Sequence, residues 1–235
     1  MHLVMFDIDG TLTQSDEVDS DCYAQAVAEV LNLPPIDRDW SRYQHVTESG
    51  IAREIIATHF GRQPIPGELE RIKGRFVELL HEALCADPNS CSPIPGALSM
   101  LSAVSARDDL TIALATGGWE QSAQLKLRSA GFNVETIAFA SADDSTQREQ
   151  IMLIAHVRAL ERCGREAFDS VIYVGDGLWD LQASRRLCIP FIAVANGDHA
   201  RKLRAHGAQF ILPDFRDCGR FLEMLQSVQS AHRGR

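Results

Sequence analysis

The sequence predicts an α/β protein with a doubly wound parallel sheet and a small helical domain inserted after the first strand. In the second half of the chain, short apolar segments alternate with segments of helical periodicity, which is typical of parallel strands joined by helices. The stretch from about Asp16 to Asp87 breaks this alternation, because only helical patterns occur there. The 235 residues therefore divide into a core, 1–15 with 88–235, and an inserted helical domain, 16–87.

The core elements are expected to follow one another as strand and helix. Each predicted strand is short and apolar, as expected for a strand buried on both faces of a parallel sheet. The predicted strands are Leu3–Phe6, Leu110–Ala115, Thr136–Ala140, Val171–Val174, Phe191–Val194 and Phe210–Leu212. The helices expected between the later strands are Gln121–Ala130, Gln147–Cys163, Leu178–Leu187 and His199–His206.

The inserted domain is expected to contain helices at Cys22–Leu31, Gly50–Phe60 and Glu68–Leu84. After it, Pro95 is placed as the first residue of a helix that leads back into the core. Because the insertion lies between the first strand and the next, we expect it above the carboxyl ends of the strands. That edge is where open α/β sheets bind ligands.

The composition is that of an ordinary globular protein, with 45% hydrophobic and 23% charged residues. A net charge of −9, without basic runs, argues against nucleic-acid or anionic membrane partners. No apolar stretch is long enough to span a bilayer, and the six cysteines show no C-x-x-C pairing. We therefore expect a cytoplasmic protein, monomeric or dimeric, that binds neither nucleic acid nor membrane.

The segment Asp7-Ile8-Asp9-Gly10-Thr11 follows directly on the first predicted strand. Because side chains alternate along a strand, Asp7 and Asp9 leave the strand end facing the same way, and Gly10 permits a sharp turn. Two carboxylates held together at a strand end can bind a hard divalent cation, or divide into a nucleophile and a general acid. The alternative is a turn without further function.

A second strand end carries the sequence Thr116-Gly117-Gly118. The Thr116 hydroxyl could donate to a phosphoryl group, with the amides of Gly117 and Gly118 at the helix N-terminus beside it. A simple turn without a ligand is the alternative.

A third strand end carries Asp176, with Asp180 four residues further on. These residues suit a metal site, and the alternative is that they complement the dipole of the helix that begins there.

In this order, the three motifs resemble the DxDGT, Thr-bearing and GDxxxD motifs of the haloacid dehalogenase superfamily of phosphatases and phosphomutases. The resemblance spans nearly the whole chain. It implies a Rossmann-like core and identifies the inserted helices as the cap that closes over the substrate, as in the branch of phosphoglycolate phosphatase and β-phosphoglucomutase.

The resemblance also implies roles for the acidic residues. Asp7 would attack phosphorus and form an aspartyl-phosphate, while Asp9 would serve as general acid and base. Mg²⁺ would neutralise the approaching anions, held by Asp7, Asp176 and the backbone carbonyl of Asp9. Asp180 would orient a metal-bound water or a neighbouring group.

One motif departs from the superfamily pattern, which has a lysine, usually followed by proline, after the third strand to offset the charge of the nucleophile. No lysine lies between Lys126 and Lys202. Arg148 occupies the expected region and is the candidate substitute, because a guanidinium stays charged and can hold phosphate through two hydrogen bonds. Lys126 is the competitor, although its place in a helix before Gly131 is typical of an ordinary surface residue.

For substrate recognition, the polar loop Tyr43–Gly50 is the candidate, because in the resembled family this loop faces the active site. His45, Thr47 and Arg53 are the residues that could contact the leaving group. The alternative is a solvated loop in which Thr47 or Ser49 caps the following helix.

The second carboxylate, Asp9, favours phosphate-ester chemistry, since the dehalogenases and phosphonatases of the superfamily lack it. The leading hypothesis is a Mg²⁺-dependent phosphatase that hydrolyses a small phosphorylated metabolite through an aspartyl-phosphate. A phosphomutase of the same superfamily is the close alternative. A non-catalytic phosphate-binding regulatory protein on the same scaffold is the third.

Overall fold

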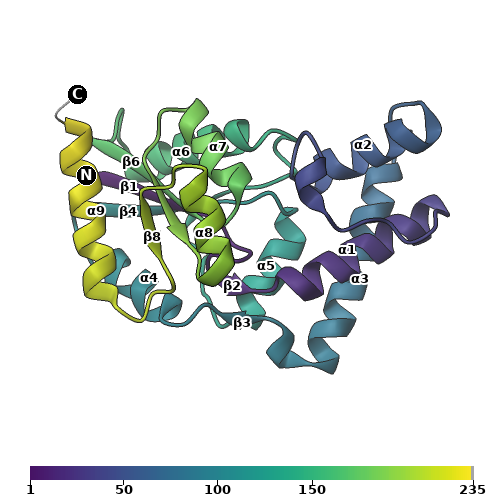
Figure 1. The fold of residues 1–235 in the computed structure, drawn as a ribbon, viewed down its shortest axis with the longest axis horizontal. Coiled ribbons are helices and arrows are strands. Elements are labelled where there is room, and N and C mark those ends of the chain that lie inside the picture. The colour runs from purple at the N-terminus through teal and green to yellow at the C-terminus, as the bar shows by residue number, and fades with distance from the viewer. Residues whose placement is uncertain (234–235) are drawn as a thin grey trace.

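The computed structural model describes residues 1–233 and confirms the predicted class, an α/β fold with a six-stranded parallel sheet (Figure 1). The strand order is β5-β4-β1-β6-β7-β8. The strands are β1 (His2–Phe6), β4 (Leu110–Ala115), β5 (Ala138–Ala140), β6 (Ser170–Gly175), β7 (Phe191–Val194) and β8 (Phe210–Leu212). Because β1 lies between β4 and β6, the loops that follow these three strands are neighbours.

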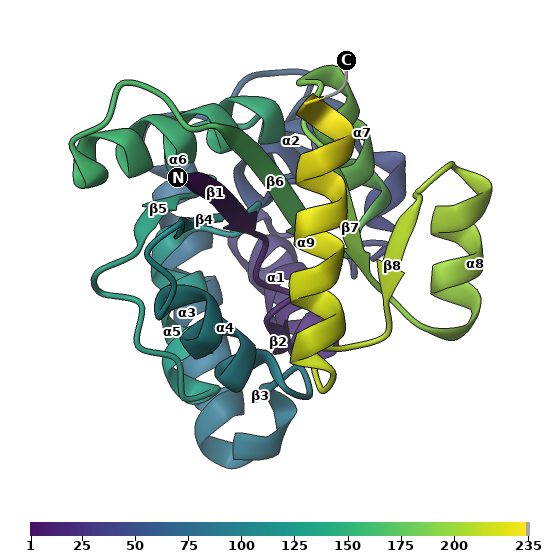
Figure 2. The ribbon, with the colours of Figure 1, turned by 90° about the vertical axis from the view of Figure 1, so that its left-hand side faces the viewer.

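Helices cover both faces of the sheet (Figure 2). One face is covered by α4 (Ala97–Ser105), α5 (Glu120–Ser129) and α9 (Cys218–Arg233). The other face is covered by α6 (Arg148–Cys163), α7 (Leu178–Arg186) and α8 (Gly197–Ala205). Among the described helices, none has both the length and the apolar character that a membrane span needs.

The alternation of side chains along β1 divides the apolar residues between the two faces. Val4 and Phe6 belong to the cluster beneath α4, α5 and α9, whereas Leu3 and Met5 belong to the cluster beneath α6, α7 and α8. All four side chains are fully buried, so β1 forms the centre of the core. The buried strand therefore delivers Asp7 to a well-defined position at its carboxyl end.

The insertion after β1 is helical, and we call residues 16–87 the cap segment. The chain leaves and re-enters the core through a short antiparallel ribbon, β2 (Thr13–Gln14) with β3 (Ser92–Pro93). The helices between them are α1 (Asp16–Leu31), η1 (Trp40–Arg42), α2 (Glu48–Phe60), α3 (Glu68–Ala86) and η2 (Pro88–Ser90). Figure 1 shows α1, α2 and α3 together to the right of the sheet. Their buried apolar residues form one continuous cluster with those of the core face under α4, α5 and α9.

Three helices differ from the sequence prediction. The helix expected to begin at Pro95 begins at Ala97, because Gly96 is its N-cap, with a positive φ. The first helix of the cap segment begins at Asp16 instead of Cys22, because its first turn is acidic and polar, which suits a helix N-terminus but hides the apolar pattern. Helix α9 was not predicted, although Phe221, Leu225 and Val228 are buried at helical spacing along it. This helix completes the cover of one sheet face.

The return from the cap segment requires a glycine at position 96. Gly96 has a φ of +83°, and a Cβ there would lie 2.3 Å from the backbone carbon of Phe215. The amide of Phe215 also donates to the carbonyl of Pro95 (2.9 Å), so the two backbones cannot separate without losing a hydrogen bond. This contact joins the start of α4 to the segment before α9.

We expect Gly96→Ala to lower the free energy of unfolding by about 3 kcal/mol, because backbone strain and a backbone clash add together. Gly164→Ala is the matched control, since Gly164 has a φ of +60° and open space around it. It should cost about 1 kcal/mol, from backbone strain alone. Denaturant unfolding measures both, and equal losses would contradict the proposed clash.

Candidate active site

The nucleophile predicted from the sequence, Asp7, lies where β1 ends. Its amide donates to the carbonyl of Val174 in the adjacent strand β6 (2.9 Å), which fixes the backbone, and its side chain is 5% exposed. The following turn depends on Gly10, which has a φ of +69°. A Cβ on Gly10 would lie 2.3 Å from Oδ2 of Asp176, so the missing side chain lets Asp176 approach the turn.

Three carboxylates come together at this point. One oxygen each from Asp7, Asp176 and Asp180 lies within 4.8 Å of the other two. Burial, together with the charge of Asp180, raises the pKa of Asp7 to about 8. Desolvation and the neighbouring carboxylates, Asp16 foremost, raise the pKa of Asp176 well above its usual range. In the absence of a cation, this environment therefore disfavours the ionised forms of Asp7 and Asp176.

The donor set fits Mg²⁺, which prefers carboxylate oxygens. Oδ1 of Asp7 is buried and accepts no hydrogen bond from the described residues, although Nη1 of Arg148 lies 3.3 Å away, so its lone pairs remain open to a cation. Asp180 is less available, because its Oδ1 accepts from Arg148 (2.8 Å) and its Oδ2 accepts from the amide of Gly177 (2.9 Å). In this structure Asp180 contacts Arg148, and the division of the three carboxylates into metal ligands and a positioning residue stays a prediction.

Thr116 follows β4 and lines a cavity of about 250 Å³ that Asp7 and Asp176 also line. Its Oγ1 accepts a hydrogen bond from the amide of Gly118 (3.1 Å), so its own proton remains free to be donated. Gly117 is packed against Arg148, since a Cβ on Gly117 would lie 2.3 Å from Nη2 of that arginine. The missing side chain of Gly117 therefore lets Arg148 approach the backbone closely. The amide of Gly118 orients the Thr116 hydroxyl.

Arg148 is the first residue of α6 and lies beside the nucleophile. Its Nη1 is 3.3 Å from Oδ1 of Asp7 and 2.8 Å from Oδ1 of Asp180, and its Nη2 donates to the carbonyl of Val46 in the cap segment (3.1 Å). The side chain is 10% exposed. A permanent positive charge therefore lies at the position where the superfamily lysine was expected.

The sequence-based expectation for Lys126, an ordinary surface residue, is wrong. Lys126 is fully buried, and its Nζ lies 2.7 Å from Oδ2 of Asp9 and contacts Oδ1 of Asp19. Burial alone would lower the pKa of Lys126, but Asp19 and Asp9 raise it well above its usual value, so the ammonium stays charged. The sequence did hold a signal that Lys126 is on the buried face of its helix. Lys126 lies three residues after Ala123 and one before Leu127, and both of these are buried.

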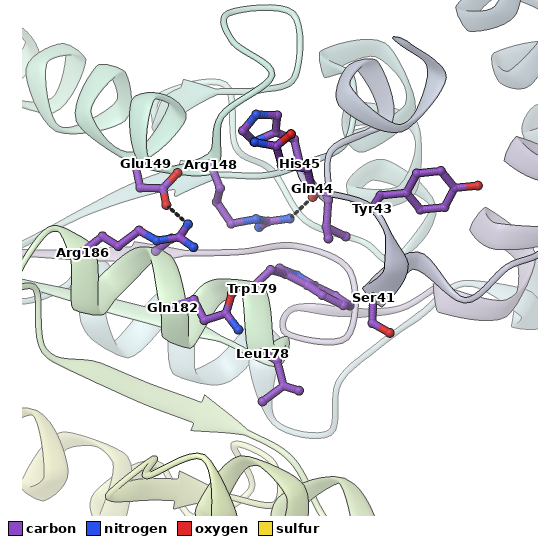
Figure 3. A pocket seen from close by; sticks show the side chains of 12 residues that line it. Ser41, Tyr43, Gln44, His45, Arg148, Glu149, Leu178, Trp179, Gln182 and Arg186 are labelled. Atoms are coloured by element: carbon purple, nitrogen blue, oxygen red, sulfur yellow. Dashed lines mark hydrogen bonds and ion pairs between the residues drawn. The ribbon is translucent and has the colours of Figure 1, made fainter. Parts of the chain in front are cut away.

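The predicted substrate residues lie in three different places. Thr47 lines the cavity, caps α2 through the amide of Gly50 (3.1 Å) and donates to the carbonyl of Thr146 (2.9 Å). His45 lines a second cavity of about 150 Å³ (Figure 3), and Val46, Arg148 and Trp179 line both cavities. Arg53 is exposed on α2 and lines neither cavity.

Glu48 was not predicted as a site residue, yet it ties the cap segment to the core. Its carboxylate accepts from the amide of Trp119 (2.6 Å) at the N-terminus of α5, and its own amide donates to the carbonyl of Gly117 (2.8 Å). A buried carboxylate at a helix N-terminus is stabilised by the helix dipole and the free amides. Because Glu48 and Trp119 are 71 positions apart, no local sequence pattern predicts this contact.

Together these residues enclose a cavity of about 250 Å³ between the core and the cap segment. The core contributes Asp7, Asp9, Thr116, Gly117, Gly118, Arg148, Asp176 and Trp179 to its wall. The cap segment contributes Asp16, Asp19, Ser20, Tyr23, Trp40, Val46, Thr47, Glu48 and Ile51. Among the described lining residues, Arg148 is the only basic side chain, so the wall of the cap segment is acidic and aromatic.

We expect the melting temperature of the metal-free protein to fall as the pH rises from about 5 to about 8. The raised pKa values of Asp7 and Asp19, about 8 and about 6, mean that the folded state holds protons that the unfolded state has released. Stability is then lost as the pH rises through the folded-state pKa values. Mg²⁺ should offset this loss, because it binds only the ionised carboxylates.

Thermal unfolding at several pH values, with and without Mg²⁺, measures both effects. Asp176→Asn should abolish the stabilisation by Mg²⁺ because it removes a ligand. A melting temperature that rises steadily over this pH range without metal would contradict the prediction.

Comparison with known proteins agrees with the motifs. The family model of haloacid dehalogenase-like hydrolases matches residues 1–187. No curated protein matches this chain. The match of the family model includes all three motif-bearing strand ends, from Asp7 to Asp180.

Solved structures share the fold over nearly the full chain. A hydrolase from Pseudomonas syringae is 19% identical, with a TM-score of 0.70 over 95% of this chain and 99% of that one. β-Phosphoglucomutase from Clostridium difficile is 16% identical, with a TM-score of 0.70 over 99% of each chain. CbbY from Rhodobacter sphaeroides, in complex with phosphate, is 19% identical, with a TM-score of 0.68 over 92% of this chain and 96% of that one.

At these identities the structural similarity establishes the fold alone, whereas the family model covers most of the chain and every motif of the site. The chain therefore belongs to the haloacid dehalogenase-like hydrolases.

Proposed function

We propose that this protein is a Mg²⁺-dependent phosphatase that hydrolyses a small phosphorylated metabolite in the cytoplasm through an aspartyl-phosphate on Asp7. The observation that carries the proposal is the surroundings of Asp7. Its buried carboxylate lies beside Arg148, close to Asp176, and lines a cavity of metabolite size. Residues 1–15 and 88–235 would form the catalytic core, and residues 16–87 the cap domain.

In the first step, an oxygen of Asp7 attacks phosphorus, and the bond from phosphorus to the alcohol oxygen breaks. Arg148 offsets the charge of the nucleophile, and the Thr116 hydroxyl donates to a phosphoryl oxygen. Asp9 gives a proton to the departing alcohol. When bound by Asp7, Asp176 and the carbonyl of Asp9, Mg²⁺ would supply charge neutralisation between the carboxylate and the phosphate.

In the second step, a water attacks phosphorus and gives its proton to Asp9, and the bond from phosphorus to Asp7 breaks. Inorganic phosphate is released and both carboxyl groups return to their starting states. The contacts that Glu48 and Thr47 make with the core hold the cap segment over the cavity, which limits the access of bulk water.

The phosphomutase alternative has support from the shared fold with a β-phosphoglucomutase. A mutase transfers the phosphoryl group to a sugar that already carries a phosphate, so its cavity must hold a second dianion. Here the cap wall presents Asp16, Asp19 and Glu48, and no basic side chain among its described lining residues. The described residues of this wall therefore offer a second phosphate no counter-charge, which favours the hydrolase.

Asp7→Asn should lower the hydrolysis of 4-nitrophenyl phosphate by at least about 10³-fold, because the amide cannot form the aspartyl-phosphate. Removal of Mg²⁺ with a chelator should have a similar effect. Asp198→Asn, at an aspartate that is 82% exposed on α8, should leave the rate unchanged. Retained activity in Asp7→Asn would disprove the assignment of the nucleophile.

The product distinguishes the two phosphoryl-transfer functions. A phosphatase releases one inorganic phosphate for each alcohol formed, whereas a mutase interconverts isomers of a sugar phosphate with little release of phosphate. The phosphoenzyme should be stable in acid and sensitive to hydroxylamine, as an acyl phosphate is. A protein that binds Mg²⁺ and phosphate but never forms this species would instead be the non-catalytic alternative.

Arg148→Met should lower kcat/KM by about 10² to 10³-fold, because the transition state loses a buried positive charge beside Asp7. Arg162→Met, at an exposed position in the last turn of the same helix, is the matched control and should change kcat/KM little. Inhibition by inorganic phosphate should weaken in parallel in Arg148→Met. Unchanged kinetics would remove Arg148 from the reaction.

A further inference from the structure

Helix α5 buries a lysine that the steps above do not use. Lys126 exposes none of its side chain, and it lies on the core side of the boundary with the cap segment. Its Nζ is 2.7 Å from Oδ2 of Asp9 and also contacts Oδ1 of Asp19 in the first turn of α1. A buried ammonium is costly unless it is paired, and these two carboxylates supply the pairing.

The same ammonium decides how Asp9 is oriented. Oδ1 of Asp9 accepts from the hydroxyl of Ser15 (2.5 Å), while Oδ2 accepts from Lys126. The carboxyl plane is therefore held at both oxygens. A protonated carboxyl has one O–H donor besides its remaining acceptor sites, so Asp9 can carry the proton that it gives while Ser15 and Lys126 donate to it.

The four residues of this arrangement come from three parts of the chain. Asp9 belongs to the turn after β1, Lys126 to a core helix, and Ser15 and Asp19 to the start of α1, where the core continues into the cap segment. Removing Lys126 would leave Asp9 and Asp19 as neighbouring carboxylates of like charge, with no described cation between them. Their repulsion would turn Asp9 away from its present orientation.

We propose that Lys126 is a positioning residue for the phosphatase reaction: with Asp19, it holds the carboxyl group of Asp9 where it gives its proton to the departing alcohol. The inference rests on the proposed function. Lys126 keeps its own proton in both steps. The proton moves only between Asp9 and the alcohol oxygen in the first step, and between water and Asp9 in the second.

The leaving group provides the test. Glycerol 2-phosphate releases an alkoxide that needs a proton, whereas 2,4-dinitrophenyl phosphate releases a phenolate that needs none. The value of kcat/KM reports the steps up to formation of the aspartyl-phosphate. A residue that acts through Asp9 therefore affects kcat/KM for the first ester and spares the second.

Two variants remove the ammonium. Lys126→Met keeps the length of the side chain, and the double variant Lys126→Met with Asp19→Asn removes one positive and one negative charge together, so that the net charge of the cluster is preserved. For both, we expect kcat/KM for glycerol 2-phosphate to fall about 10²-fold and that for 2,4-dinitrophenyl phosphate to fall less than about threefold. Lys202→Met, at an exposed lysine of α8, serves as the control.

A double-mutant cycle with Asp9→Asn separates positioning from a structural role. In the Asp9→Asn background, Lys126→Met should cause no further loss with glycerol 2-phosphate, because the group that it positions is already gone. Equal losses with both esters, or additive losses in the cycle, would overturn the role of Lys126 while the phosphatase assignment stands. A wild-type protein that hydrolyses neither ester with Mg²⁺ would overturn both.

Discussion

The crowding of carboxylates at the carboxyl ends of β1 and β6 is the constraint on which the rest of the site depends. Asp7, Asp9, Asp176 and Asp180 come from the ends of only two strands, and burial among neighbouring carboxylates raises the pKa of Asp7 and of Asp176. Two buried cations lie among these carboxylates. Arg148 pairs with Asp7 and Asp180, and Lys126 pairs with Asp9 and with Asp19 of the cap segment. The charge that remains lies where a divalent cation would be bound.

Because Arg148 pairs with Asp7 and Lys126 pairs with Asp9, the two carboxylates of the DxDGT motif have different chemical surroundings. Asp7 lies in a buried position where desolvation raises its pKa, and its Oδ1 accepts no hydrogen bond from the described residues. Asp9 has both oxygens engaged, by Ser15 and Lys126. One carboxylate is thus available to a metal and to phosphorus, while the other is held in place by neighbouring donors. Two identical side chains two residues apart acquire different surroundings, as the proposed division into a nucleophile and an acid requires.

The cap segment takes part in these charge interactions and also covers the site. Val46, Thr47 and Glu48 make hydrogen bonds with Arg148, the loop before α6 and the N-terminus of α5. The position of the cap segment is therefore linked to the residues that surround Asp7. The same segment lines one side of the cavity with acidic and aromatic side chains, among them Asp16, Glu48, Tyr23 and Trp40.

The sequence by itself determined the parallel sheet and the motif-bearing strand ends, because buried parallel strands are continuous apolar runs and their carboxyl ends meet at one edge. It also identified Arg148 as the candidate for the missing lysine, from its place after the third strand. Only the tertiary structure decided which cation meets which carboxylate. Lys126 and Asp9 are 117 positions apart, and the helix face that turns Lys126 inward is set by packing against the cap segment. Charge pairing across such distances depends on how elements pack, and no local pattern encodes it.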